Sequence, residues 1–292
     1  MRSYGPLSPA LFWRAFFFGV ATATSISAAP PPKPPEGLAQ VGKLDPVESR
    51  RVLEQFRRAG IDGEYYLEFT LHQLPRRGVE RVFPGQLWGG RNARGSIVRI
   101  ALRDGDGQQR RLLVQNGDEP AVWTFANGKI SPSGMAALLA PLVPGVELTA
   151  FDLEMPFVAW PDVADTAIVR VLGRPAHAFF FRPPAEFAAA HPEVAAVRGF
   201  FDVQFNVPTQ TEILDASGKA TKTLSLVELK RLGGQTIPKV LEVRNELSRD
   251  KTRLVVTAAA LQLNLASKIF DPAALADEIK PPAADRLVPI LP

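Results

Sequence analysis

The first folded part of the chain shows a helical spacing of hydrophobic residues. In Val47–Ala59, Val52 and Phe56 fall on one face, Asp45-Pro46 provides a start signal, and Gly60 provides a stop signal. This spacing predicts an amphipathic helix whose hydrophobic stripe packs against a sheet. We interpret its basic side as a solvated face, with a membrane or partner site as the alternative.

After this helix the hydrophobic pattern changes to a period of two. From Tyr65 to His72, residues at odd positions are hydrophobic or aromatic and those between them are mostly polar, which predicts a half-buried strand. Short connections rich in Gly, Asn and Asp follow each strand-like segment and favour antiparallel neighbours. Helical or irregular structure is expected at 131–161 and Pro184–Arg198. Further strands are predicted at Val79–Leu87, Ser96–Arg103, Gln109–Gln115, Ala121–Ala126, Ala167–Leu172, His177–Arg182, Phe200–Asn206, Thr211–Asp215, Lys222–Lys230, Gln235–Leu247 and Arg253–Leu261.

The N-terminus has the composition of an export signal. Arg2 and Arg14 precede the apolar or small stretch Ala15–Ala29, and a proline-rich segment, 30–43, follows it. We predict that residues 1–29 are a cleaved signal peptide and that 30–43 are a linker. The alternative is an uncleaved membrane anchor, but the stretch is shorter than the roughly 20 residues of a spanning helix. With no Cys in the chain, a lipoprotein anchor, disulfides and thiolate metal sites are excluded.

The length of the chain predicts one large domain, and its charge argues against a nucleic-acid partner. We predict a domain at 44–280 and a C-terminal tail at 281–292. The 34 Lys and Arg are interspersed with 30 Asp and Glu, for a net charge of +4. This balance, without a basic helix face or an aromatic RNA motif, argues against nucleic-acid binding.

No recognisable catalytic constellation occurs in the sequence. The three histidines, His72, His177 and His191, lack metal-ligand neighbours at His-x-His or His-x-x-x-His spacing. Ser131–Gly134 is not a nucleophile elbow. The Asp104–Gly107 loop lacks the later glutamate of a calcium loop and is better explained as a hairpin tip. We therefore expect no enzyme activity, no metal and no cofactor.

Turn and strand motifs in the second half carry a family resemblance. The segments that carry it are Phe151-Asp152-Leu153, Gly199–Phe205, Glu212–Lys219, Leu232–Pro238, Thr252–Val256 and Phe270. On these segments the chain resembles the LolA-like outer-membrane lipoprotein-sorting family over about 45–275, and Phe151-Asp152-Leu153 is similar to the short acidic-aromatic stretch of that family. The chain departs from the family in the inserted Pro184–Arg198 segment and at Leu214.

The resemblance implies an α+β fold, a curved antiparallel half-barrel whose concave face is covered by helices. It also implies an apolar cavity and a periplasmic carrier or sensor of a lipid or of lipoprotein acyl chains. An inner-membrane transporter or an envelope-stress protein are possible partners. The alternative is a non-catalytic interaction subunit of an envelope complex, either a transporter accessory or an envelope-stress regulator, without bound lipid.

Aromatic content supports a cavity of this kind. The chain has 18 Phe and 4 Trp, more than one packed face of a thin sheet accommodates without a second layer or a cavity. A dry pocket between sheet and helices would take acyl chains, with about 0.8 kcal/mol for each buried methylene. For each candidate, ordinary core packing is the alternative. The candidate lining residues are Leu67, Phe69, Leu71, Ile100, Leu113, Trp123, Phe125, Phe157, Trp160, Phe201, Val203 and Phe205.

Overall fold

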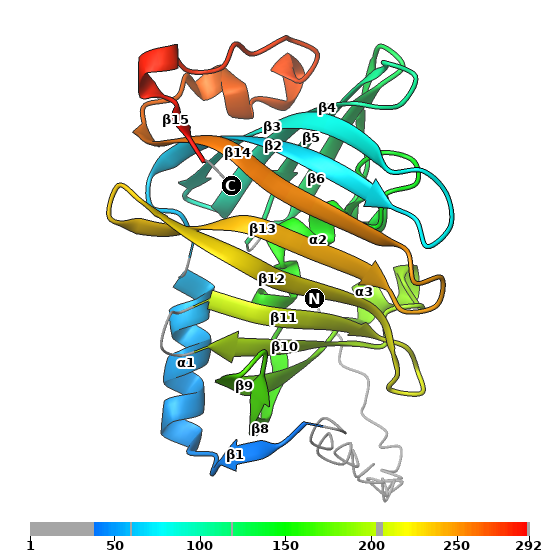
Figure 1. Ribbon diagram of the computed structural model, residues 1–292, viewed down its shortest axis with the longest axis vertical. Coiled ribbons are helices and arrows are strands. Elements are labelled where there is room, and N and C mark those ends of the chain that lie inside the picture. Colours follow the sequence, from blue (N-terminus) through cyan, green and yellow to red (C-terminus); the bar gives the residue numbers. More distant parts are fainter. Residues whose placement is uncertain (1–37, 59, 118, 203–206, 291–292) are drawn as a thin grey trace, which may run out of the picture. The chain divides into compact units, whose positions relative to one another are not determined.

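In the computed structural model, the described residues form fifteen strands in one open antiparallel sheet (Figure 1). Along the sheet the order is β1-β8-β9-β10-β11-β12-β13-β14-β2-β3-β4-β5-β6-β7, and β15 pairs with β14. The strands are β1 (Gln40–Gly42), β2 (Glu64–Leu74), β3 (Arg81–Asn92), β4 (Gly95–Arg103), β5 (Gln109–Gln115), β6 (Ala121–Ala126), β7 (Lys129–Pro132), β8 (Asp162–Val171), β9 (Arg174–Arg182), β10 (Ala196–Asp202), β11 (Val207–Leu214), β12 (Ala220–Leu232), β13 (Gln235–Asn245), β14 (Lys251–Leu263) and β15 (Val288–Pro289). The structure describes residues 38–58, 60–117, 119–202 and 207–290.

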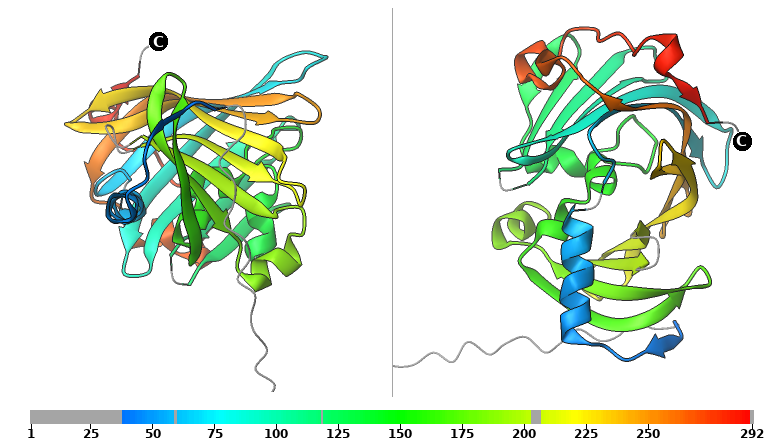
Figure 2. Two further views of the ribbon diagram at one scale, coloured as in Figure 1. Left: turned by 90° about the horizontal axis from the view of Figure 1, so that it is seen from below. Right: turned by 90° about the vertical axis from the view of Figure 1, so that its left-hand side faces the viewer.

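The sheet contains two meanders, β2–β7 and β8–β14, in which consecutive strands are neighbours. The last strand of the second meander pairs with the first strand of the first. Their junction is the pairing of β14 with β2, where Val256 lies opposite Phe69 and Leu254 opposite Leu71. The sequential neighbours β7 and β8 consequently lie near opposite ends of the sheet. Figure 2 shows the sheet curling around the inner space that α1 crosses. The predicted α+β fold, a curved and unclosed antiparallel sheet, is confirmed.

Helix α1 (Pro46–Arg58) forms where the sequence predicts it. Asp45 Oδ1 accepts the backbone N–H of Val47 at 2.9 Å, so the side chain satisfies an N-terminal donor. The stripe Val52, Leu53 and Phe56 is buried in the main core. The helix therefore lies with its hydrophobic face toward the inner side of the sheet.

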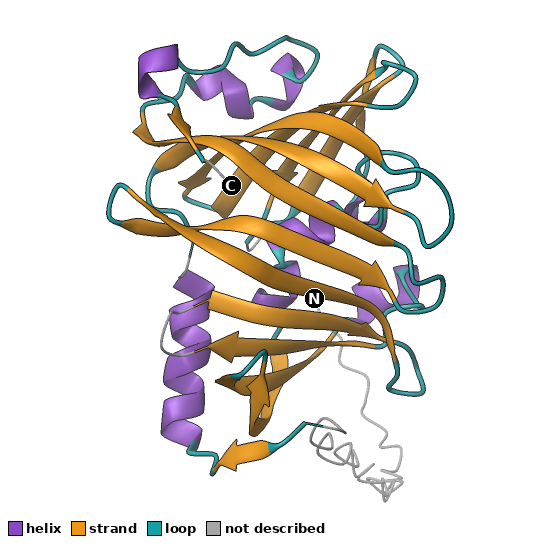
Figure 3. Ribbon diagram, viewed as in Figure 1, coloured by secondary structure: helices purple, strands orange, loops and turns teal. Residues whose placement is uncertain are grey.

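Short helices add to this inner layer (Figure 3). Between the two meanders lie η1 (Met135–Leu139), α2 (Ala150–Glu154) and η2 (Pro156–Ala159), and α3 (Ala185–Ala190) lies between β9 and β10. A capping box starts α2, in which Thr149 Oγ1 accepts the N–H of Asp152 and Asp152 Oδ2 accepts the N–H of Thr149. Lys222 Nζ of β12 donates to the same Asp152 oxygen at 2.5 Å. This ion pair ties α2 to the sheet.

The C-terminal segment covers the outer face of the sheet. It contains η3 (Ser267–Phe270), η4 (Pro272–Ala274), η5 (Ala284–Arg286) and β15, and Ile290 after them is buried. Within the predicted tail, 281–292, β15 pairs with β14. The predicted linker at 30–43 also contains a strand, β1, which pairs with β8.

Other predictions differ from the structure in extent. The helix expected in Pro184–Arg198 is α3 alone, because Pro192 follows its end and β10 already begins at Ala196. The predicted signal peptide, residues 1–29, lies outside the described residues. Within the described part of the chain, no helix has the length and apolar character needed to cross a membrane.

Candidate ligand-binding cavity

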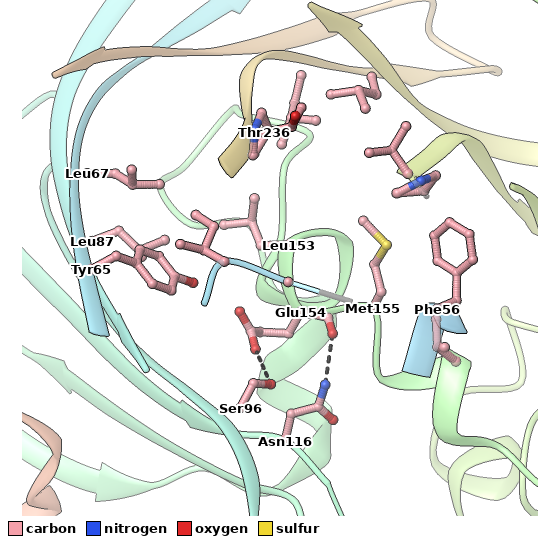
Figure 4. Close-up of a pocket in the computed structure, with 18 of the residues that line it drawn as sticks. Phe56, Tyr65, Leu67, Leu87, Ser96, Asn116, Leu153, Glu154, Met155 and Thr236 are labelled. Atoms are coloured by element: carbon pink, nitrogen blue, oxygen red, sulfur yellow. Dashed lines mark hydrogen bonds between the residues drawn. The ribbon is translucent and has the colours of Figure 1, made fainter. Parts of the chain in front are cut away.

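A cavity of about 880 Å³ lies between the inner face of the sheet, the C-terminal end of α1 and the α2–η2 segment (Figure 4). This volume is within the range of small-molecule sites. Strands β2, β3 and β11–β14 contribute most of its wall. The apolar side chains of the wall are Phe56, Ile61, Leu67, Phe69, Leu87, Leu153, Met155, Val158, Leu224, Leu226, Leu229, Leu241, Leu254 and Val256.

Two glycines of β3 make room for aromatic rings on the inner face. Gly89 lies opposite Tyr65 and Gly85 opposite Phe69 in the β2–β3 register. A Cβ on Gly89 would lie 2.2 Å from Tyr65 Cζ, and one on Gly85 would lie 2.4 Å from Phe69 Cζ. Glycine in a strand often marks such a close approach. The two rings can therefore occupy these positions only because β3 carries no side chain there.

The end of the α1 helix is fixed to the opposite wall of the cavity. Arg57 Nε donates to the carbonyl oxygen of Val158 at 3.0 Å, and its Nη2 donates to that of Trp160 at 3.3 Å. These bonds satisfy carbonyl groups of the irregular η2 segment. They hold α1 and η2 together beside the cavity, where Phe56 and Val158 form part of its wall.

One end of the cavity is polar. The carboxyl group of Glu154 accepts a hydrogen bond from Ser96 Oγ at 3.2 Å, and its backbone carbonyl accepts one from Asn116 Nδ2 at 2.8 Å. Figure 4 shows the Tyr65 hydroxyl pointing toward this carboxyl group. Burial raises the pKa of Glu154 to about 7, against the smaller lowering effects of the Ser96 bond and the Arg91 charge. Burial also raises the pKa of Tyr65, and the charge of Glu154 adds to that effect.

Four predicted candidates lie on this inner face. Leu67 and Phe69 line the cavity. Leu71 and Ile100 are fully buried in the main hydrophobic core, farther along the same face. Alternation along β2 and β4 brings all four to one side of the sheet.

Three candidates lie on the other face of the sheet. Leu113 is fully buried, and Trp123 and Phe125 are partly buried, in a cluster that includes Ile97 and Leu275. Their strand neighbours Leu112, Val114 and Val122 belong to the inner core. The outer cluster packs against the C-terminal segment, so these three side chains are separated from the cavity by the sheet itself.

An aromatic cluster fills the inner space near β9 and β10. Phe157 lies 5.3 Å from Phe181 between ring centroids, and Phe201 lies 3.9 Å from Phe56. Trp160, which is 6% exposed, belongs to the same cluster. These three candidates are packed core residues beside the cavity. The remaining candidates, Val203 and Phe205, lie outside the described residues.

Reasoning from the sequence alone missed Glu154, Tyr65 and the two glycines. A signal for part of this arrangement exists, since Gly85 and Gly89 are four residues apart in a strand-like segment and therefore face the same side. Glu154 has no comparable local signal. It directly follows the Phe151-Asp152-Leu153 stretch, in which Phe151 is buried and Asp152 caps the helix.

The histidines have structural partners in the described part of the chain. His177 Nδ1 contacts Asp165 Oδ2, which also accepts a hydrogen bond from Ser49 Oγ at 2.6 Å. Since Ser49 bonds the carboxylate and not the imidazole, this is not the arrangement of a nucleophile and its base. The described residues hold no group of three or more His, Cys, Asp or Glu that could bind a metal.

The Asp104–Gly107 loop is a hairpin tip, as predicted. Asp104 Oδ1 accepts backbone N–H groups of Asp106 and Gln108, and Arg110 Nε donates to Oδ2 at 2.9 Å. These bonds hold the pKa of Asp104 below its usual value, with the Arg110 bond as the largest cause. The Asp104 carboxylate therefore stabilises the turn in which it lies.

Of the comparisons with known proteins, the one with solved structures bears on the architecture. A family model described as an uncharacterized protein matches residues 199–277. The curated proteins gave no match. Among solved structures, a DUF1329 family protein from Desulfovibrio piger superposes with a TM-score of 0.67 and 13% identity, covering 80% of this chain and 100% of that one.

Two further solved structures share the fold. A putative outer membrane lipoprotein-sorting protein domain from Vibrio parahaemolyticus has a TM-score of 0.65 and 12% identity, covering 77% of this chain and 97% of that one. A LolA superfamily protein from Nitrosomonas europaea has a TM-score of 0.56 and 13% identity, with 76% and 96% covered. The chain therefore has a LolA-like fold, as the sequence resemblance implies. At these identities the likeness is one of fold.

Proposed function

We propose that this protein is an exported carrier or sensor that holds a lipid, or the acyl chains of a lipoprotein, in the inner cavity. The observation that carries the proposal is the cavity itself, about 880 Å³ in volume and walled mainly by aliphatic and aromatic side chains. Burying hydrocarbon in such a site is favourable by about 0.8 kcal/mol for each methylene. The fold supports the proposal, since one structure that shares it is a putative lipoprotein-sorting domain.

Export, binding without catalysis and the choice of partner belong to the same proposal. The predicted leader, residues 1–29, would deliver the protein to the periplasm, and the intact mass of the exported protein would show whether it is removed. An inner-membrane transporter or an envelope-stress protein would be the partner that loads or reads the carrier. We propose no enzyme activity, because the polar groups of the cavity do not form a nucleophile–base pair.

The test places a bulky side chain on the cavity side of one strand. The same substitution on the opposite side of that strand is the control. Leu226 of β12 lines the cavity, whereas the next residue, Val227, is 56% exposed. Leu226→Trp should lower the affinity for a fluorescent fatty-acid probe at least about tenfold, because the indole takes up space that the chain would occupy. Val227→Trp should bind as the parent does.

Equal binding by the parent and Leu226→Trp, with both folded by circular dichroism, would move the probe site away from this cavity. If the parent binds no amphiphile at all, the interaction subunit without bound lipid becomes the better proposal. Native mass spectrometry of protein purified from a membrane-containing extract would detect acyl species that bind during production.

A further inference from the structure

The polar end of the cavity holds a carboxyl group that is only half satisfied. Glu154 is the last residue of α2, and Asn116 fixes its backbone carbonyl. Ser96 bonds Oε2, while Oε1 accepts no hydrogen bond from the residues that the structure describes. A carboxylate can accept about four hydrogen bonds. Glu154 therefore presents acceptor capacity to an otherwise mainly apolar cavity.

The groups around this carboxyl come from four elements. Tyr65 of β2 and Arg91 of β3 influence it electrostatically, and Ser96 of β4 and Asn116 are uncharged. On its own helix, Asp152 is already paired with Lys222. Arg91 is exposed at the end of β3, and the carboxyl group forms no ion pair with any described residue. Arg57, Arg58 and Arg91 also line the cavity, and the charge of Arg91 acts on Glu154, but none of the three forms an ion pair with it. A cation in the cavity would thus meet a carboxylate that is not ion-paired.

We propose that this end of the cavity binds the primary ammonium group of an amphiphile whose hydrocarbon chain lies along the apolar wall. The inference rests on the proposed function and adds the chemistry of the ligand head. An ammonium has three N–H donors. Glu154 Oε1 is available to accept one of them, and the Tyr65 hydroxyl, which points to the same place, is available to accept another.

Charge favours this head over an anionic one. A carboxylate or phosphate head placed against Glu154 would bring two negative charges together at a partly buried site, where their repulsion is stronger than in bulk water. A charge-assisted N–H to carboxylate bond is about twice as strong as a neutral one. Burial raises the pKa of Glu154 to about 7, so the preference for a cation should be full above pH 8 and weak near pH 5.5.

The test uses three twelve-carbon amphiphiles with different heads, each below its micelle concentration: dodecylamine, dodecyltrimethylammonium and dodecanoate. Binding to the purified protein is measured by displacement of a fluorescent apolar probe at pH 8.5 and pH 5.5. At pH 8.5 dodecylamine should bind at least about tenfold more tightly than dodecanoate, with dodecyltrimethylammonium between them because it has charge but no N–H. At pH 5.5 this preference should largely disappear.

Glu154→Gln should remove the preference at pH 8.5 while keeping the chain site. Glu186→Gln makes the same charge change at an exposed position on α3 and should leave the preference intact. Tight dodecanoate binding that persists in both variants would overturn the inference and point to Arg91 as the head group's partner. Equal affinity for all three heads would also overturn it but leave the proposed function standing. Absence of any binding would overturn both.

Discussion

The two faces of strands β2–β6 are built from alternating residues of the same segments, yet they meet different partners. On the outer face, Tyr66, Trp88 and Leu113 are almost completely buried against the C-terminal segment, which contributes Ile269 and Leu275. On the inner face, side chains of the same strands line a cavity of about 880 Å³. The outer face is covered by the chain itself, whereas the inner face leaves room for a ligand.

The hydrogen bonding of polar side chains also differs between the outer and the inner face. On the outer face, Arg99 is 1% exposed and donates to the carbonyl oxygens of Ile269, Ala274, Leu275 and Asp277. Burial lowers its pKa to about 10, and the nearby charge of Arg111 adds to the effect. The two terminal nitrogens of the buried cation are thus matched by backbone acceptors, while its Nε has no hydrogen-bond partner among the described residues. On the inner face, Glu154 has one bond from Ser96 and an open oxygen.

This difference separates a face that the chain covers from a face that borders a cavity. The covered face places its buried charge against fixed backbone groups, because an unmatched buried charge is strongly destabilising. On the cavity face, the carboxyl group of Glu154 has an oxygen without a hydrogen-bond partner among the described residues. Removing a matched charge should therefore destabilise the fold, whereas removing the unmatched one should stabilise it.

Arg99→Met should give the largest effect on stability. The substitution removes hydrogen bonds to four carbonyl groups of the C-terminal segment and leaves buried acceptors unpaired, so we expect a loss of about 3–5 kcal/mol. Urea denaturation measures the loss, and limited proteolysis should show early cleavage between 264 and 287. Arg103→Met, at the exposed end of the same strand, should change stability by less than about 0.5 kcal/mol. Similar curves for the two variants would mean that Arg99 does not hold the segment.

Glu154→Gln should have the opposite sign, with an effect that grows between about pH 4.5 and pH 7 and is full above that range. The pKa of Glu154 is about 7 in the folded protein and near 4.5 in an unfolded chain. The folded state therefore binds more protons between these values, and stability falls as pH rises from about 4.5 to 7. In the ligand-free protein we expect the glutamine variant to be more stable by about 1–3 kcal/mol at pH 8.5 and nearly equal to the parent at pH 4.5. Thermal melts at the two pH values measure this difference.

A variant that is less stable than the parent at pH 8.5 would show that the carboxylate is matched after all. Glu186→Gln serves again as the control for the change in net charge, since its side chain is exposed. It should melt with the parent at each pH. This comparison separates the local desolvation of Glu154 from the general effect of removing one negative charge.

The local pattern of hydrophobic and polar residues predicted several strands and the first helix well. The predicted strands Gln109–Gln115 and Ala121–Ala126 coincide with β5 and β6, and the helix prediction differs from α1 by one residue at each end. Alternation also separated Leu113 from its neighbours Leu112 and Val114. It could not show which face the chain would cover, because that depends on the C-terminal segment folding back onto the sheet.

The polar end of the cavity could not be predicted for the same reason, since it depends on contacts between distant segments. The pairing of β2 with β14 joins segments about 180 residues apart, and no local signal encodes such a contact. Glu154 acquires its raised pKa only from the surfaces that α2, β2 and β4 bring around it. The family resemblance and the aromatic content predicted an apolar cavity, and of the twelve candidate lining residues Leu67 and Phe69 of β2 lie on the wall of the inner cavity. The polar end depends on tertiary structure.

Gly89→Ala tests the inner face with the smallest change. A methyl group at this position would meet the Tyr65 ring at 2.2–2.6 Å, so the ring must rotate away from β3 and into the cavity. We expect a stability loss of about 1–2 kcal/mol, typical of overpacking, and a severalfold weaker binding of the fluorescent fatty-acid probe. Gly105→Ala is the matched control, since its Cβ would have only ordinary contacts, 3.7 Å from Arg81 Nη1 and 3.8 Å from Phe83 Cε1.

If Gly89→Ala binds the probe as tightly as the parent while losing stability, the Tyr65 ring is part of the packed core and the probe occupies another part of the cavity. If binding and stability both remain unchanged, the close approach of Tyr65 to β3 has no role in keeping the inner face open.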